Sequence, residues 1–204
     1  GQSVSDTIKG TNDATVYTIG DGDNTMMISD RILTFRNYEN LLAGSGNDVF
    51  NFTGSGRLSG NLDGGTGSDT LNYAAYSSGV EVDLNDGTAT GIGGNVLGIE
   101  NMIGSAYDDN LTGDGNDNIL AGLAGNDILN GGTGSDTVDY SGNTVSGVSV
   151  SLAEGWATGI ESGSDTLSGI ENVIGTSFDD EIFGDDNDNR LEGGAGDDLI
   201  SGLG

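Results

Sequence analysis

The feature that most constrains this chain is a nine-residue period in residues 104–139. Four consecutive nonapeptides read GSAYDDNLT, GDGNDNILA, GLAGNDILN and GGTGSDTVD, and each begins with glycine. The sixth position is Asp or Asn in every unit, and the eighth is Leu or Val. The same register returns at 175–201. A short fixed period with one apolar residue per unit is typical of a solenoid, in which stacked units bury what no single unit can.

Each nonapeptide has room for one turn and one very short strand. Two of them make a flattened coil with a strand on each side, so stacked coils bury the eighth positions as two facing rows. The sequence therefore predicts an all-β chain, a right-handed parallel β-roll that widens into a less regular β-helix over the spacers. Short strands are also expected at 15–19, 31–35, 79–84 and 147–152.

The nonapeptides belong to a larger duplicated unit. GGTGSDTLN at 64–72 returns as GGTGSDTVD at 131–139, and GIENMIG at 98–104 returns as GIENVIG at 169–175. The incomplete last nonapeptide suggests a fragment of a longer protein. We predict three parts: irregular N-terminal coils with a degenerate repeat at 1–63, a first repeat unit with its spacer at 64–130, and a second unit, truncated at its C-terminal end, at 131–204.

The composition limits the possible partners. The chain carries 33 acidic and 5 basic residues, a formal net charge of -28. Self-repulsion of this size opposes compaction, so a cation is expected to neutralise the chain, whereas nucleic acid and anionic membranes are unsuitable partners. No apolar run approaches the length of a membrane span, so no membrane insertion is expected.

The same composition selects the metal. Cysteine and histidine are both absent, which excludes thiolate and imidazole ligands. The remaining donors are carboxylates, amides and backbone carbonyls, which are hard oxygen ligands suited to calcium.

The repeat spacing also predicts where the metal binds. Turns on one edge of the coil are separated by two nonapeptides, because successive nonapeptides alternate edges. Stacked strands are about 4.8 Å apart, so two carboxylates held in neighbouring turns need a cation between them. The sixth-position residues paired by this spacing are Asp109 with Asp127, Asn118 with Asp136, and Asp180 with Asp198. Asp48 and Asp69 lie farther apart than two nonapeptides and depart from the spacing.

These motifs resemble the RTX (repeats-in-toxin) family of secreted bacterial proteins, and the larger unit resembles repeats of very long bacterial surface and adhesin proteins. In that family one turn supplies the carbonyls of positions 2 and 4, its partner supplies those of positions 1 and 3, and each adds its position-6 side chain. The resemblance implies roughly four to eight Ca²⁺ ions per chain. The implied ligands are Asp48 and Asp69; Ser105, Tyr107 and Asp109 with Gly122, Ala124 and Asp127; Asp114, Asn116 and Asn118 with Gly131, Thr133 and Asp136; and Thr176, Phe178 and Asp180 with Gly193, Ala195 and Asp198.

Some residues depart from the family pattern or lie outside it. Tyr107 and Phe178 replace glycine at position 4, and Asn118 and Asn189 replace the acid at position 6. The first two sites are therefore expected to be weaker or distorted. Other side chains have structural interpretations: Tyr73 and Tyr140 are expected in the core, Trp156 is expected to pack on the coil wall, and Glu81 and Asp83 are expected on a solvated face.

The favoured function is a non-catalytic calcium-binding module of a secreted or cell-surface bacterial protein. It would stay extended at low cytosolic calcium, fold on extracellular calcium and act as a structural or adhesive segment, with export by type I secretion implied by the resemblance. The chain is expected to be a monomer without catalytic residues. The alternative is a glycan-binding module, or an accessory module of a polysaccharide-acting protein, with an extracellular glycan or surface as partner. A lyase is disfavoured because histidine is absent and basic residues are few.

Overall fold

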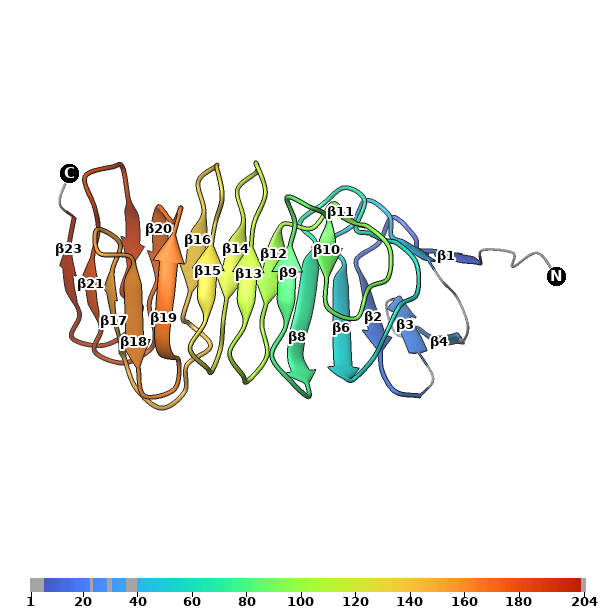
Figure 1. Cartoon of the computed structure of the whole chain (residues 1–204), viewed down its shortest axis with the longest axis horizontal. Helices are drawn as coiled ribbons and strands as arrows, with labels where there is room; N and C mark the ends of the chain where they lie inside the picture. The colour runs from blue at the N-terminus through green and yellow to red at the C-terminus, as the bar shows by residue number, and fades with distance from the viewer. Residues whose placement is uncertain (1–5, 23, 29–30, 36–39, 203–204) are drawn as a thin grey trace.

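The chain forms an elongated all-β stack, with strands following one another along the long axis from the N-terminal to the C-terminal end (Figure 1). The computed structural model describes residues 6–22, 24–28, 31–35 and 40–202. Every regular element in this part of the chain is a strand, and most strands have only two to five residues. Within the same residues, no helix has the length and apolar character needed to cross a membrane.

The described residues form three sheets. The ten-stranded sheet contains, in order, β22 (Arg190–Glu192), β20 (Asn172–Ile174), β16 (Thr137–Asp139), β14 (Ile119–Ala121), β12 (Asn101–Ile103), β8 (Thr70–Tyr76), β6 (Val49–Gly54), β2 (Thr15–Ile19), β3 (Asn24–Ile28) and β4 (Arg31–Phe35). The nine-stranded sheet contains β10 (Thr88–Ala89), β9 (Glu81–Asp83), β13 (Asn110–Thr112), β15 (Ile128–Asn130), β19 (Gly163–Ser168), β18 (Trp156–Gly159), β17 (Val148–Ser151), β21 (Glu181–Phe183) and β23 (Leu199–Ser201). The four-stranded sheet contains β1 (Thr7–Lys9), β5 (Asn40–Leu42), β7 (Leu62–Asp63) and β11 (Val96–Leu97).

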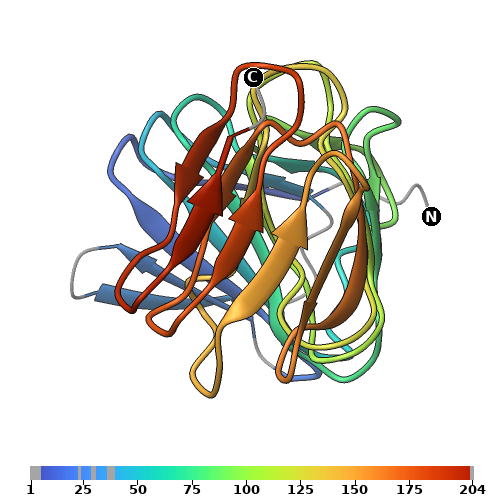
Figure 2. The same ribbon diagram turned by 90° about the vertical axis from the view of Figure 1, so that its left-hand side faces the viewer.

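The strand register confirms the nine-residue period. Leu111 of β13 aligns with Leu129 of β15, and Leu120 of β14 aligns with Val138 of β16, and both pairs are parallel and separated by two nonapeptides. Successive nonapeptides therefore alternate between two sheets, and the end-on view shows strands on different sides of each coil joined by turns (Figure 2).

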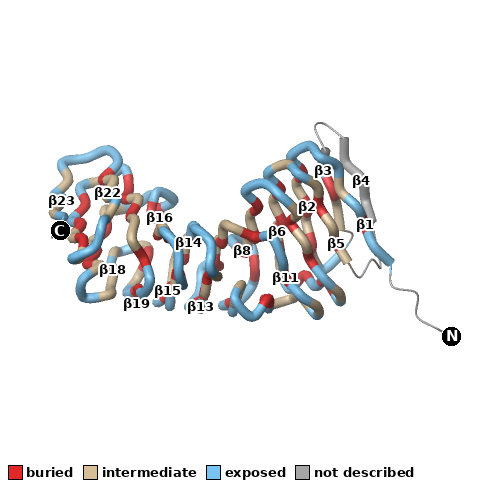
Figure 3. Tube along the Cα trace, turned by 90° about the horizontal axis from the view of Figure 1, so that it is seen from above, coloured by how far each residue is buried: buried red, intermediate tan, exposed pale blue. Residues whose placement is uncertain are grey.

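The core is the double row of apolar residues predicted at position 8. Leu111, Leu120, Leu129 and Val138 are all 0% exposed. Buried positions run along the interior of the stack, while exposed positions gather at the turns (Figure 3). The N-terminal coils are filled by larger side chains than the nonapeptide coils, among them Tyr17, Phe50 and Phe52.

The predicted strands at 15–19 and 31–35 coincide with β2 and β4, and those at 79–84 and 147–152 shorten to β9 and β17. The antiparallel run β17–β18–β19 was not predicted. It lies in the second spacer, and the first spacer holds a shorter antiparallel pair, β9 with β10.

The side chains that were expected to pack in the structure or to face solvent, and not to bind metal, lie largely where the sequence predicts. Tyr73 and Tyr140 are buried in the core, and Glu81 is exposed. Trp156 is half-buried in β18, and its Nε1 donates a hydrogen bond to Glu154 Oε2 at 2.7 Å. The prediction of wall packing for Trp156 is therefore met only in part.

Candidate metal centre

The position-6 residues form ladders along the turn edges. The backbone N–H of one position-6 residue donates to Oδ1 of the position-6 Asp in the next coil, at 2.9 Å from Asp109 to Asp127 and 2.8 Å from Asn118 to Asp136. Asp180 and Asp198 form the equivalent pair at 3.0 Å. The structure thus brings together all three pairs that the spacing of two nonapeptides predicted.

Asp48 and Asp69 form the same contact despite their wider spacing in the sequence. The Asp48 N–H donates to Asp69 Oδ1 at 2.7 Å. Here β6 has six residues where a regular coil has three, so the extra residues lengthen the strand and leave the turns aligned.

A second ladder runs alongside in the opposite direction. At position 5 the N–H of the later coil donates to the side chain of the earlier one, at 2.8 Å from Asn126 to Asp108 and 2.8 Å from Ser135 to Asp117. Asp197 and Asp179 repeat this contact at 2.8 Å. Each turn edge is therefore bonded to its neighbour by two antiparallel rows of side-chain hydrogen bonds.

The turns occur in two conformations. In the first, which we call closed, the position-2 N–H donates to the turn's own position-6 side chain. This bond measures 2.5 Å from Ser105 to Asp109, 2.9 Å from Asp114 to Asn118 and 2.6 Å from Thr176 to Asp180. A closed turn therefore satisfies its own acidic or amide side chain.

In the second conformation, which we call open, positions 2 and 4 both have positive φ. The values are 72° at Leu123 and 137° at Gly125 in one turn, and 100° at Gly132 and 145° at Gly134 in the next. Leu123 is the one non-glycine residue with positive φ among the described residues. The turns 64–69 and 193–198 are open in the same way.

The open turns leave buried carboxylate oxygens without a donor. Asp69, Asp127 and Asp136 are each at most 1% exposed, and the Oδ2 atom of each has no hydrogen-bond partner. A buried polar atom left in this state destabilises a fold by about 1–3 kcal/mol, and more when it is charged. A bound cation would remove that cost, so these residues fit a metal.

Burial also disfavours charge on these side chains. It raises the pKa of Asp127 to about 7, with the nearby carboxylates of Asp165 and Asp109 adding to the shift. Burial likewise raises the pKa of Asp69 to about 6, and that of Asp136 above its usual value. The shifts share one physical cause, which is a negative charge removed from water with no positive charge beside it.

Main-chain and side-chain oxygens converge at each predicted site. A Cβ atom on Gly104 would collide with Asp109 Oδ2 and lie 2.8 Å from the carbonyl oxygen of Gly122. At Gly113 the two oxygens belong to Asn118 and Gly131, and at Gly175 they belong to Asp180 and Gly193. Position 1 needs glycine because these oxygens occupy the space of a side chain. Gly122, Gly131 and Gly193 are among the residues that the resemblance implied as ligands.

The departures at position 4 do not strain the backbone. Tyr107 and Phe178 lie in closed turns, where position 4 has no positive φ, so glycine is not required there. The hydroxyls of Ser105 and Thr176 hold these turns by donating to Asp109 and Asp180, at 2.8 and 3.0 Å. The other implied ligands would act through backbone carbonyls of the paired turns, closed for Asn116 and open for Ala124, Thr133 and Ala195.

Three acidic residues that extend the position-6 ladders were not predicted. Asp165 accepts a hydrogen bond from the Asp127 N–H at 3.0 Å, and Glu100 and Glu171 accept from the N–H groups of Asp69 and Asp136 at 2.8 and 2.9 Å. The signal for Asp165 was present, because GSDT at 163–166 repeats the GSDT of 67–70 and 134–137.

The donor set suits calcium better than a metal that prefers side chains. Within the described ranges, no three His, Cys, Asp or Glu side chains gather into one cluster. Each predicted site offers two position-6 side chains and several carbonyl oxygens, a mixture that calcium accepts at about six to eight ligands.

Comparison with known families identifies the repeats. The sequence model of the RTX calcium-binding nonapeptide repeat, in four copies, matches residues 103–138 and 165–200. The second match begins at Asp165, the ladder residue that the period had not revealed. Such repeats are non-catalytic modules and are typical of secreted bacterial proteins. No curated protein matches the chain.

Proposed function

We propose that this chain, which carries RTX calcium-binding nonapeptide repeats, is a non-catalytic segment of a secreted or cell-surface bacterial protein that folds when it binds extracellular calcium. The supporting observation is the set of unpartnered, fully buried oxygens of Asp69, Asp127 and Asp136 in a chain of net charge -28. The chain offers few bases to compensate these charges, and divalent cations supply what is missing.

Three ions would lie between paired turns of a right-handed β-roll. The first would be held by turns 104–109 and 122–127, the second by 113–118 and 131–136, and the third by 175–180 and 193–198. Asp48 and Asp69 would contribute to a further metal position. Calcium would supply positive charge to the Asp oxygens and coordinate the carbonyls that converge on the position-1 glycines. The predicted units, 64–130 and 131–204, would each contain at least one such site.

Metal binding would then be part of the folding free energy. Without calcium, each coil combines self-repulsion with a thin core of one apolar residue per nonapeptide. A ligand that binds only the folded chain stabilises it in proportion to the logarithm of its concentration. The segment would remain extended at low cytosolic calcium, suited to type I secretion, and condense outside the cell. There a monomer would serve as a structural or adhesive segment facing an extracellular glycan or surface.

The test is circular dichroism of the chain during calcium titration. We expect a disordered far-UV spectrum in chelator and β signal at millimolar calcium, with both forms recovered on cycling. A full β spectrum and an unchanged melting temperature in chelator would refute the coupling of folding to calcium.

A further inference from the structure

The two GIEN segments form unusually short turns. Leu97 aligns with Asp63 and Asn101 with Thr70, so Gly98–Glu100 spans in three residues what the neighbouring coil spans in the six residues 64–69. In the second unit, Gly169–Glu171 lies in the same way beside the six-residue turn 131–136. Ile99 and Ile170 are buried and anchor the two short turns in the core.

Each short turn presents a glutamate where a regular turn presents Asp. Glu100 Oε2 accepts from the Asp69 N–H, and Glu171 Oε2 accepts from the Asp136 N–H. The extra methylene lets the carboxylate reach the ladder from a turn with fewer residues.

The buried oxygens that face these turns have no donor. Asp69 and Asp136 are 0% exposed, and their Oδ2 atoms are unpartnered. A Cβ on Gly64 would collide with the Gly98 carbonyl oxygen and lie 2.7 Å from Asp69 Oδ2, so both oxygens lie on one side of Gly64. A Cβ on Gly131 would likewise collide with the Gly169 carbonyl oxygen, and there it would also meet the Cβ and Cγ atoms of Asp136. This is the arrangement found at Gly104, Gly113 and Gly175.

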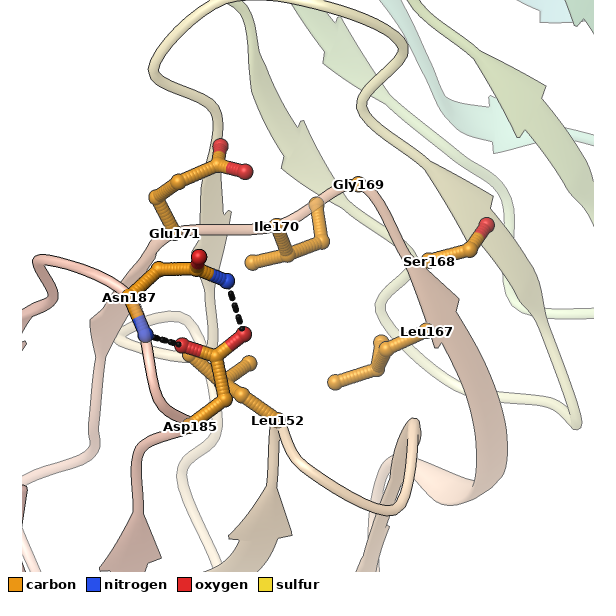
Figure 4. Close-up of a pocket in the computed structure, with 8 residues that line it drawn as sticks. All are labelled: Leu152, Leu167, Ser168, Gly169, Ile170, Glu171, Asp185 and Asn187. Atoms are coloured by element: carbon orange, nitrogen blue, oxygen red, sulfur yellow. Dashed lines mark hydrogen bonds between the residues drawn. The ribbon is translucent and has the colours of Figure 1, made fainter. Parts of the chain in front are cut away.

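The neighbouring acidic groups do not share this arrangement. Figure 4 shows the cavity of about 160 Å³ beside Glu171, where the carboxylate of Asp185 accepts bonds from both nitrogens of Asn187 and the Glu171 carboxylate is directed away from Leu152 and Leu167. The second oxygen of Asp165 accepts a bond from the Tyr140 hydroxyl. In the described part of the chain, an ion pair joins Arg190 to Glu192, so that arginine is engaged elsewhere.

We propose that Asp69 with Glu100, and Asp136 with Glu171, hold two further calcium ions outside the paired nonapeptide turns, with the Gly98 and Gly169 carbonyls as additional ligands. The proposal rests on the calcium-dependent function above and extends it to the spacers. The GIEN segments are then metal-binding turns that extend the series of calcium sites from the nonapeptide turns into the irregular coils.

The deciding experiment is a crystal structure of the chain grown in calcium, with anomalous scattering used to locate the ions. We expect peaks between Asp69 and Glu100 and between Asp136 and Glu171, in addition to those in the nonapeptide turns. Peaks in the nonapeptide turns alone would overturn this inference and leave the proposed function standing. No peak at any turn would overturn both.

Calorimetric calcium titration of a double variant, Glu100→Gln with Glu171→Gln, provides a second measurement. Glutamine keeps an oxygen for the Asp69 and Asp136 N–H groups but removes the charge. We expect two fewer ions per folded chain, with the wild-type count retained in the control Glu81→Gln, an exposed position. An unchanged count and affinity in the double variant would show that the glutamates only cap the ladder. If the double variant does not fold in calcium, the wild-type anomalous map decides the question.

Discussion

The Tyr140 hydroxyl donates a hydrogen bond to Asp165 Oδ2 at 2.9 Å, at the point where one ladder of carboxylates ends. The other oxygen of Asp165 accepts from the Asp127 N–H, so this carboxylate is satisfied by protein groups alone. In the first unit the equivalent Tyr73 donates to the Thr90 carbonyl at 2.5 Å, because the shorter spacer has no counterpart of Asp165. One unit therefore ends this ladder with a tyrosine–carboxylate pair that the other lacks.

Tyr140→Phe should destabilise the calcium-bound chain by about 1–3 kcal/mol, because it leaves a buried carboxylate oxygen without its donor. Urea unfolding in saturating calcium measures the change. Tyr107→Phe is the matched control, since that side chain is 51% exposed. Equal stability of the two variants would contradict a structural role for the pair.

Asp127→Asn should raise the calcium concentration needed for folding by about tenfold, equivalent to about 1.4 kcal/mol. Asparagine retains an oxygen for the Asp109 N–H and is the natural residue at position 118, so the turn is preserved while the charge is lost. Asp83→Asn removes the same charge from a β9 side chain that accepts from the Asp86 N–H, and should leave the midpoint close to wild type. Indistinguishable midpoints would mean that calcium acts as a diffuse counterion.

Gly131→Ala should lower stability by about 1–3 kcal/mol, the usual cost of forcing an atom into a filled space. The new Cβ would meet the Gly169 carbonyl oxygen and the Asp136 side chain. Gly142→Ala is the control, because its Cβ would find only Leu123 Cδ2, at 3.7 Å. Thermal unfolding in calcium compares the two variants. Equal melting temperatures would contradict the crowding at position 1.

Lowering the pH should partly replace calcium. The pKa of Asp127 is raised to about 7 and that of Asp69 to about 6 in the metal-free fold, against 3.8 for the ordinary side chain. A raised pKa means that the folded state binds protons more tightly, so its stability is greatest below the unfolded pKa of 3.8 and falls as the pH rises from there to about 6 for Asp69 and about 7 for Asp127. The calcium-free chain should show more β signal at pH 5 than at pH 8 by circular dichroism. Less β signal at pH 5 would contradict the assignment.

Magnesium should fold the chain poorly at concentrations where calcium succeeds. It demands a near-octahedral shell of shorter bonds and sheds water reluctantly, whereas these sites offer carbonyl-rich, less regular oxygen sets. Parallel titrations followed by circular dichroism measure the two midpoints, and coincidence of the midpoints would exclude the selectivity.

The parts predicted from the sequence are those that follow directly from the nine-residue period. It predicted the buried rows of Leu111 and Leu129 and the stacking of Asp109 on Asp127, because a solenoid converts a fixed spacing into a fixed neighbour. Glu100 and Glu171 were missed because their contacts cross spacers of variable length, where no spacing predicts the partner, whereas Asp165 was missed although the repeated GSDT motif marks it.

The presence of two turn conformations, closed and open, was also hidden from the sequence. Leu123 takes a positive φ that glycine usually provides, while Tyr107 stands at a nominal glycine position that does not need one. Backbone conformation at these points depends on the neighbouring coil, so the local residue does not reveal it.

The three-residue turns have a consequence for how a repetitive chain finds its own alignment. Nearly identical nonapeptides can pair equally well after a slip of one full coil, so their register is weakly determined by their own sequence. Such a slip would place the short turn Gly98–Glu100 beside the wrong partner and draw Ile99 out of its buried place. The two GIEN segments would therefore fix the register of an otherwise repetitive chain, because only one alignment of the coils keeps both short turns beside their partners.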